Sequence, residues 1–448
     1  MSSGRHRRAE PRSGWLSKGV LAVADQGLFA LTNFVVSLLL ARWLPAREYG
    51  GFAVAFSVLL LLGTVHTAVL TEPMLIFGPS RYRGRTASYL RLLTPLHFAL
   101  TAALSAVVLF VVLILALTGT ASGSGGALVG VAVSAPAILF LWLARRACYI
   151  DALPGLAAAA GLIYAVLVPT GMLLLTALGW LTAASALLTL GAASLLVGLG
   201  LRRRLTRSVG PAAEPLRSGE VARDHWTYGR WALASGLLSW VPGNIVVLAL
   251  PLWHSLAEAG TLRVATTLIM PVQQVQAALA TLLLPSLVRA RESGRLRSTA
   301  TTAQLVFAGS SLGYAPIVLL LGSALTGSLF GEQYRLSGTT LWLVAAIPFF
   351  TAVSLVSVAV LRAVERPDQV LLTSVGSTAV TFLIGLPLIW RWGVDGALAS
   401  ILLSAVAAAV LAKWANVRIT SGTTTSARRH GRRVATGLKA APARSHSR

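Results

Sequence analysis

Arg263 is the residue whose type and position most directly suggest chemistry, because it is a lone cation inside a long apolar stretch. An α-helix turns about 100° per residue. This rotation brings a set of polar side chains onto or beside the face of Arg263: Thr267, Gln273, Gln274 and Gln276. Hydrocarbon does not tolerate such a stripe, so we expect it to face protein or water. A guanidinium there can bind phosphate oxygens in a bidentate manner. The alternatives are an arginine that reaches outward to water or an ion pair with Glu258, one turn earlier.

Two acidic residues and a histidine also fall inside apolar stretches. Asp25 lies about two turns into the first stretch, where its carboxyl can carry a proton or hold a cation, and we predict that it is an ion-binding residue. The alternative is a carboxylate close enough to the inner surface to meet water or an arginine. Glu72 directly precedes Pro73, with His66 upstream. Proline frees a backbone carbonyl that needs a partner or water, so Glu72 and His66 are predicted to line a cavity; the alternative is an early helix end.

A further polar cluster lies near the middle of residues 231–252 and contains Trp240, Pro242, Gly243 and Asn244. Proline and glycine together predict a kink. The amide of Asn244 is expected to pair with backbone that the kink frees. We therefore include Asn244 among the predicted cavity residues.

The elements that carry these residues follow from composition. The chain has 448 residues, of which 55% are hydrophobic and 12% charged, and its mean hydropathy is +0.74. So few charges cannot cover a soluble surface, which excludes an ordinary soluble enzyme or a disordered chain and predicts a polytopic membrane protein. The net charge of +24 indicates basic loops beside anionic lipid, and no nucleic-acid partner is predicted. The single cysteine, Cys148, excludes an internal disulfide and a cysteine-based metal site.

The hydropathy pattern predicts twelve membrane spans, each of about 20 or more residues. The first six are residues 19–42, 50–77, 93–117, 127–147, 155–177 and 180–201, and the second six are 231–252, 258–288, 302–324, 338–361, 369–390 and 393–415. With this assignment nearly all of the 38 Lys and Arg residues lie on the side of the N-terminus. The opposite side has only Arg42, Arg47, Arg335 and Arg391. Because basic residues mark cytoplasmic loops, both termini are predicted to be cytoplasmic.

The chain also contains a faint internal repeat. Residues 44–55 and 254–265 align at an offset of 210, which brings Glu48 onto Glu258 and Gly50 onto Gly260. One residue of slippage brings Asn33 onto Asn244, so Asn33 joins the predicted cavity residues. A chance match between short alanine-rich segments is the alternative. Because six spans is an even number, the halves would be parallel repeats about an axis along the membrane normal.

The predicted fold is therefore an all-α polytopic membrane protein with twelve transmembrane helices in two six-helix parallel-repeat bundles around a central cavity. The bundles are residues 19–201 and 231–415. A basic cytoplasmic N-terminal tail (1–18), a basic cytoplasmic linker (202–230) and a disordered basic cytoplasmic tail (416–448) complete the chain.

Signatures of enzymes and cofactors are missing from the sequence. There is no phosphate-binding G-x-x-x-x-G-K-[ST] loop and no H-E-x-x-H or cysteine pair. The predicted outer loops are short, and their only acidic residues are Glu48, Glu258, Glu332 and Asp395. We predict no catalytic residues, no metal and no cofactor, and a membrane-embedded enzyme is the weakest alternative.

Residues 25–57, DQGLFALTNFVVSLLLARWLPAREYGGFAVAFS, resemble the first two helices of bacterial polysaccharide-unit flippases. These proteins belong to the multidrug/oligosaccharidyl-lipid/polysaccharide exporter (MOP) superfamily. Residues 229–287 resemble the start of their second half, and the similarity covers about 90 residues. The resemblance implies alternating access and export of a polyprenyl-(pyro)phosphate-linked oligosaccharide from the inner to the outer leaflet, for surface polysaccharide.

The resemblance further implies a multi-pass protein of the bacterial plasma (inner) membrane, in contact with membrane lipid. The expected partners are H⁺ or Na⁺ as coupling ion, a polysaccharide polymerase and glycosyltransferases. The cationic cavity of the family maps here to Arg263, with Arg42 near the outer mouth. The small number of cavity arginines departs from the family pattern.

Two other transport functions remain open at this point. An ion-coupled multidrug antiporter of the same superfamily would depend chiefly on Asp25 and Glu72. A flippase for the lipid-linked peptidoglycan precursor would be essential for growth.

Overall fold

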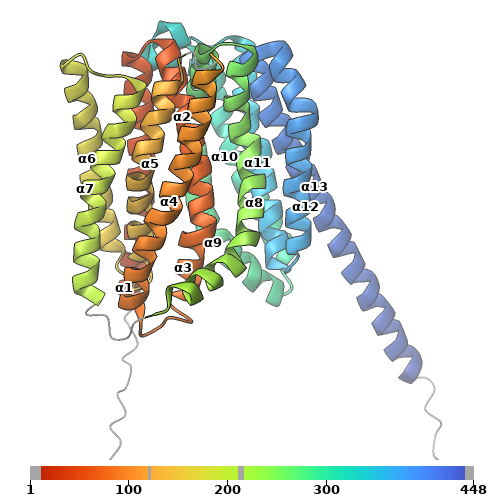
Figure 1. The fold of residues 1–448 in the computed structure, drawn as a ribbon. Helices are drawn as coiled ribbons and strands as arrows, with labels where there is room; N and C mark the ends of the chain where they lie inside the picture. The colour runs from red at the N-terminus through yellow and green to blue at the C-terminus, as the bar shows by residue number, and fades with distance from the viewer. Residues whose placement is uncertain (1–11, 120–122, 210–215, 439–448) are drawn as a thin grey trace, which may run out of the picture.

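The computed structural model describes residues 12–119, 123–209 and 216–438, and these residues form helices and connecting turns without a strand (Figure 1). Long apolar segments become helical because hydrocarbon offers the backbone no other hydrogen-bond partners. The first half comprises α1 (Arg12–Trp43), α2 (Ala46–His66), the π-helical turn η1 (Thr67–Thr71), α3 (Glu72–Phe77), α4 (Thr86–Leu117), α5 (Gly125–Ala147), α6 (Pro154–Ala177) and α7 (Ala183–Val209).

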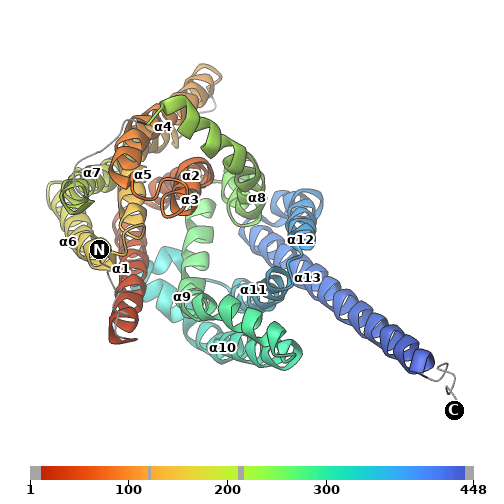
Figure 2. The same ribbon diagram turned by 90° about the horizontal axis from the view of Figure 1, so that it is seen from below.

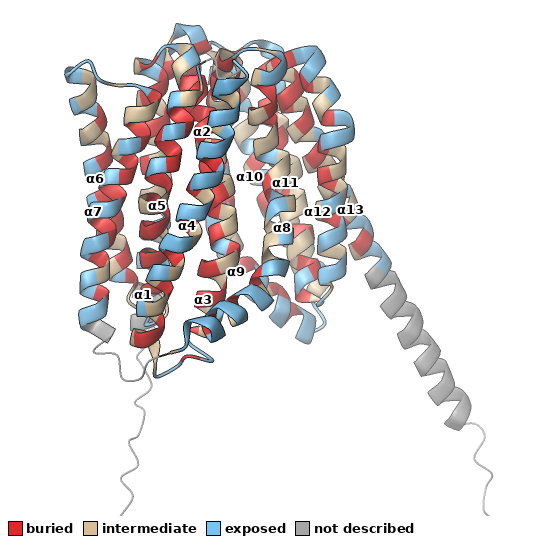
Figure 3. Cartoon of the chain, in the orientation of Figure 1, coloured by how far each residue is buried: buried red, intermediate tan, exposed pale blue. Residues whose placement is uncertain are grey.

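The second half has the same general order. It comprises α8 (Ser218–Trp253), α9 (Leu256–Glu292), α10 (Leu296–Leu325), the π-helical turn η2 (Thr326–Phe330), the 3₁₀ turn η3 (Glu332–Tyr334), α11 (Gly338–Ala363), α12 (Pro367–Val380), the π-helical turn η4 (Thr381–Gly385) and α13 (Leu386–Leu438). Large apolar side chains on the outside of the bundle are exposed, as a lipid-facing surface requires (Figure 3).

The helices make twelve passes, as the hydropathy pattern predicts. Among the described residues, ten helical segments are long and apolar enough to cross a membrane, and the bent helix α9 is an eleventh. One of the ten, Pro367–Arg418, contains two passes, because the chain reverses at Gly393, whose φ is 54°. Thr381 Oγ1 lies 2.8 Å from Ser404 Oγ, which shows that the two arms run antiparallel.

The beginning of α1 and the end of α13 lie at the same end of the bundle (Figure 1). This end, which we call the basic end, also holds the connections 78–85, 148–153, 293–295 and 364–366. The opposite end, which we call the far end, holds the connections 44–45, 178–182, 254–255 and 331–337 and the turn at Gly393. The alternation is the one from which the sequence predicts a basic cytoplasmic side.

Contacts in the two halves repeat at the offset of 210 residues that the sequence suggests. Glu48 Oε2 accepts a hydrogen bond from the backbone N–H of Ala183 at 3.2 Å. Their counterparts 210 residues later, Glu258 and Gly393, also lie in contact. Likewise α5 packs on α7 in the first half, and α11 packs on α13 in the second. The structure therefore contains two related six-helix bundles.

The two bundles meet at the far end, where α2 crosses α9 at equivalent glycines. Gly50 lies directly on the carbonyl of Leu256, and a Cβ at this position would overlap the carbonyl oxygen. A Cβ on Gly260 would lie 3.1 Å from the ring of Tyr49 and 3.2 Å from the carbonyl oxygen of Ala46. Small residues let helix backbones approach closely, so this glycine pair fixes the crossing.

The segment boundaries differ from those expected. The helix α1 begins at Arg12, within the predicted N-terminal tail, and α7 and α8 occupy most of the predicted linker 202–230. The helix α13 continues to Leu438, although a disordered tail is predicted from residue 416, because no proline interrupts the chain between Pro387 and Pro442. Residues 1–11, 210–215 and 439–448 lie outside the described residues.

Candidate functional site

Arg263 lies two turns into α9 from the far end, at the junction of the two halves. Its guanidinium carbon is 4.7 Å from the centre of the Phe56 ring on α2. Nearby, Ser37 Oγ on α1 lies 2.7 Å from Tyr49 Oη and 3.4 Å from Thr267 Oγ1, one turn along α9 from Arg263. Helices α1 and α2 of the first half and α9 of the second half therefore build one polar site.

The charge of Arg263 is not neutralised within the described part of the chain. Glu258, the ion-pair partner left open by the sequence, lies instead 3.5 Å from Nδ1 of His254. The Nε–H of Arg263 is buried and has no hydrogen-bond acceptor among the described residues. A buried cation with an unsatisfied N–H is costly unless a ligand completes it. An anion is the ligand that such a site accommodates.

The three glutamines of α9 separate into two environments. Gln276 is buried and donates from Nε2 to Ser311 Oγ on α10 at 2.8 Å, so it holds two helices of the second half together. Gln273 and Gln274 are exposed. These two amides, unlike Gln276, are therefore available to a ligand.

The asparagines and Arg42 also differ in their contacts. Asn244 Nδ2 donates to the carbonyl of Trp240, one turn earlier in α8, at 3.0 Å. The carbonyl freed by Pro242 is that of Leu238, and it accepts from Thr378 Oγ1 on α12 at 2.9 Å. Asn33 is partly exposed. Arg42 is exposed and donates to the carbonyl of Ser328 at 2.7 Å, which links α1 to the second half at the far end.

Asp25 is buried, and its carboxylate accepts hydrogen bonds from two residues of the first half that are four positions apart. Arg145 Nη2 donates to Asp25 Oδ1 at 2.7 Å, and Tyr149 Oη donates to Oδ2 at 2.8 Å. The Arg145 guanidinium also stacks on the ring of Phe29 at 3.3 Å. Burial, and then the hydrogen bond to Asp25, raise the pKa of the Tyr149 hydroxyl. The carboxylate therefore meets an arginine, which is the alternative that the sequence left open.

His66 takes part in a linear series of hydrogen bonds that joins α2, η1, α4 and α5. A carbonyl can only accept, so His97 Nε2 donates to the Pro136 carbonyl at 3.0 Å. His97 Nδ1 then accepts from His66 Nε2 at 2.9 Å, and His66 Nδ1 accepts from Thr71 Oγ1 at 3.3 Å. Both rings are buried and hydrogen-bonded inside the first half, so His66 is packed among helices and does not line an open surface.

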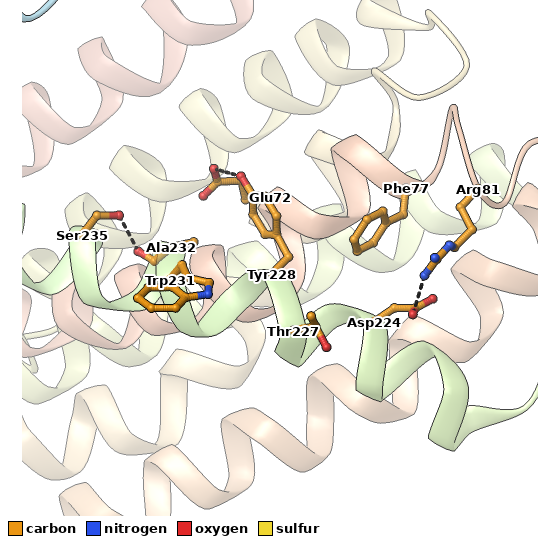
Figure 4. Close-up of a pocket in the computed structure, with 9 residues that line it drawn as sticks. All are labelled: Glu72, Phe77, Arg81, Asp224, Thr227, Tyr228, Trp231, Ala232 and Ser235. Carbon is orange, nitrogen blue, oxygen red and sulfur yellow. Dashed lines mark hydrogen bonds and ion pairs between the residues drawn. The ribbon is translucent and has the colours of Figure 1, made fainter. Parts of the chain in front are cut away.

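Glu72 lies at a cleft of about 650 Å³ between α3 and α8 at the basic end (Figure 4). Tyr228 Oη donates to Glu72 Oε1 at 2.6 Å. Beside them Arg81 forms an ion pair with Asp224, and this partner holds the pKa of the Arg81 guanidinium above its usual range. The charged groups of this cleft are thus mostly paired with each other. The remaining lining residues are Phe77, Thr227, Trp231, Ala232 and Ser235.

The structure does not gather the predicted site residues into one place. Arg263 and Arg42 lie toward the far end, while Asp25 and Glu72 lie in separate places toward the basic end. Sequence reasoning missed Arg145, Tyr49 and the α8 residues that face Glu72. No group of three or more His, Cys, Asp or Glu side chains close enough to hold a metal occurs among the described residues.

No family model and no curated protein matches the sequence. Solved structures match over almost the whole chain. A multidrug resistance MATE family transporter of the MOP superfamily in an inward-facing conformation aligns with a TM-score of 0.69 and 13% identity, over 90% of this chain and 99% of that one. A MOP superfamily transporter from Pyrococcus furiosus aligns with a TM-score of 0.62 and 13% identity, over 92% and 97%.

A eukaryotic MATE transporter aligns with a TM-score of 0.58 and 19% identity, over 89% of this chain and 94% of that one. The fold is therefore the one found in MATE transporters of the MOP superfamily.

Proposed function

We propose that this chain is a transporter that flips a polyprenyl-(pyro)phosphate-linked oligosaccharide between membrane leaflets by alternating access, for surface polysaccharide export. The observation that carries the proposal is Arg263, a partly buried cation at the junction of the halves with an unsatisfied Nε–H among the described residues. A phosphate oxygen would satisfy this donor and neutralise the charge. Gln273 and Gln274, exposed further along α9, would bind sugar hydroxyls.

The proposal places the protein in a bacterial plasma membrane with the basic end toward the cytoplasm, where lipid-linked sugars are assembled. Glycosyltransferases would supply the cargo and a polymerase would use it on the other side. Asp25 would couple transport to H⁺ or Na⁺ only in a state in which Arg145 and Tyr149 release its carboxylate.

The test is a deletion strain complemented with Arg263→Ala. We expect lipid-linked oligosaccharide to accumulate and surface polymer to be lost, while membrane levels of the protein stay normal. Arg335→Ala is the matched control, because Arg335 is an exposed far-end arginine that pairs with Glu332 at 3.0 Å. Normal polymer with Arg263→Ala would exclude Arg263 from the site.

The second candidate function is an ion-coupled multidrug antiporter. It is favoured by the shared fold with multidrug MATE transporters. The Pyrococcus furiosus transporter is described as having a binding pocket of reverse polarity that suggests a different function, so the fold itself does not decide the sign of the cargo. Loss of drug resistance with Asp25→Asn, at normal polysaccharide, would favour the antiporter. Unchanged efflux would count against it.

A third candidate, the peptidoglycan-precursor flippase, is distinguished by growth. Loss of viability on depletion, with accumulation of the peptidoglycan lipid precursor, would identify that cargo.

A further inference from the structure

The first part of α8, residues 218–236, belongs by sequence to the second half but packs on the first. We call it the α8 arm. The polar side chains of three of its residues, all within positions 224–228, join it to the first half. Asp224 accepts from Tyr82 Oη at 2.7 Å, His225 bonds to Tyr89 and to a backbone carbonyl, and Tyr228 donates to Glu72. Figure 2 shows the arm extending beneath the bundle toward α4.

His225 completes a hydrogen bond that a proline has broken. Pro73 has no N–H, so the carbonyl of Val69, four residues earlier, lacks its helical partner. His225 Nδ1 donates to this carbonyl at 3.0 Å. In the neutral ring Nε2 is then an acceptor, and it receives the hydroxyl proton of Tyr89 at 2.6 Å. The arm therefore supplies the donor that the backbone of η1 needs.

Two other prolines in the bundle are compensated from within their own half. The carbonyl freed by Pro136 is that of Ala132, and it accepts from Ser105 Oγ on α4 at 2.7 Å. The carbonyl freed by Pro242 accepts from Thr378, also in the same half. The Val69 carbonyl is different because its donor comes across the boundary between the halves. If the halves separate at this end, this bond must break.

The surface of the arm is shaped for close contact. A Cβ on Gly229 would lie 2.9 Å from the Ala68 carbonyl oxygen and 3.1 Å from Val69 Cα. A Cβ on Gly236 would lie 2.9 Å from Cγ2 of Thr64. These glycines, one at each contact, let the arm lie directly on α2 and η1.

Residues 240–243 lie between the arm and the far-end part of α8, and the helix bends most easily there. Pro242 and Gly243 follow the arm, and the Nε1–H of buried Trp240 has no acceptor among the described residues. Proline removes a helical hydrogen bond and glycine loosens the backbone, so bending concentrates at this place. The arm can therefore move without dismantling the far-end half of α8.

We infer that the α8 arm is a latch that ties the second half to the first at the basic end through His225, Tyr228 and Asp224, and that its release from α2 and η1 lets the two halves move further apart at this end. The inference rests on the proposed transport function. Water would replace His225 at the Val69 carbonyl in the released state, so the released state would not leave a buried carbonyl unpaired. Because the three contacts lie on one face of a helix, they would break together.

The test measures the distance between the halves directly and needs no cargo. Nitroxide labels are placed at two exposed basic-end positions outside the latch, Arg83→Cys in the first half and Arg297→Cys on α10 in the second half, in the full chain in lipid nanodiscs. Pulsed electron paramagnetic resonance then gives the distance distribution. The variant Tyr228→Phe removes only a hydroxyl, so it keeps the test informative if His225→Ala fails to fold.

We expect each latch variant to raise the ratio of long to short distances about fivefold, the change that loss of one neutral hydrogen bond produces. The matched control is Tyr314→Phe, which removes a hydroxyl that donates to the Leu268 carbonyl at 2.9 Å inside the second half, and it should leave the distribution unchanged. An unchanged distribution in Tyr228→Phe and His225→Ala would overturn the latch. The result is independent of the Arg263 experiment, which tests the cargo.

Discussion

The helices α1 and α8 are the first helices of their halves, and they are held in opposite ways. At the basic end α1 is fixed to its own half, through Asp25 to Arg145 and Tyr149 and through Phe29 stacked on Tyr164 at 4.8 Å. The α8 arm is fixed to the other half. The described part of α1 contains no proline, whereas α8 contains Pro242 and Pro251.

The difference shows that the pseudo-symmetry of the fold does not extend to the contacts of the first helices at the basic end. Contacts near the far end repeat at an offset of 210 residues, but those of the first helices at the basic end do not. A buried ion pair inside one half resists separation, while hydrogen bonds across the boundary can be exchanged for water. We therefore expect the first half to move as one unit with α1, and the α8 arm to leave the first half when the two halves move apart at the basic end.

The largest expected effect comes from breaking the anchor of α1. Asp25→Ala leaves the buried guanidinium of Arg145 without its carboxylate, which costs about 3–5 kcal/mol. We expect a lower unfolding temperature of the purified protein in detergent. The double variant Asp25→Ala/Arg145→Met should recover much of this loss, because it removes the unpaired charge. An unchanged unfolding temperature for Asp25→Ala would show that α1 is held by packing alone.

A smaller effect distinguishes the carbonyl freed by Pro136, inside one half, from the carbonyl freed by Pro73, at the boundary between the halves. Ser105→Ala leaves the Ala132 carbonyl buried inside one half, and loss of its donor should cost about 1–3 kcal/mol of unfolding free energy. His225→Ala removes the donor at a boundary that water enters when the arm is released, so it should lower thermal stability less and shift the distance between the halves instead. Equal destabilisation by both variants, without a change in that distance, would remove the distinction between α1 and α8.

The smallest effect is a change in thiol labelling. Cys148 follows the end of α5 beside Arg145 and is fully buried, and burial raises the pKa of its thiol to about 12. At pH 7.5 the thiol therefore stays protonated, and a maleimide should label it only after denaturation. Asp25→Asn should increase labelling of the folded protein by loosening the anchor, whereas Tyr228→Phe should not. Rapid labelling of the native chain would contradict this burial.

Much of the fold could be predicted from the sequence because it depends on local properties. Apolar segments of sufficient length give the twelve passes, and the offset of 210 follows from a short match around Gly50 and Gly260. Arg263 stands out as a lone cation among apolar residues, and the structure leaves it without an acidic partner in the described residues.

The partners of the other polar residues could not be predicted in the same way. Asp25 and Arg145 are 120 residues apart, and His66 pairs with His97 across two helices, so these contacts depend on how the bundle packs. One local feature of the sequence points to the docking of the α8 arm. Pro73 indicates that the Val69 carbonyl lacks a helical donor, but the sequence does not say which helix provides the replacement.

The crossing of α2 and α9 has a consequence for the origin of the site. In a homodimer of six-helix chains, Gly50 and Gly260 would be one residue facing its own copy, and every side chain near the axis would occur twice. In the single chain the counterparts have diverged: Tyr49 corresponds to Ala259, and Arg263 corresponds to Ala53. A single chain that holds both halves thus permits one arginine beside the axis without a second like charge opposite it. A solitary arginine at this crossing is available only to a chain that contains both halves.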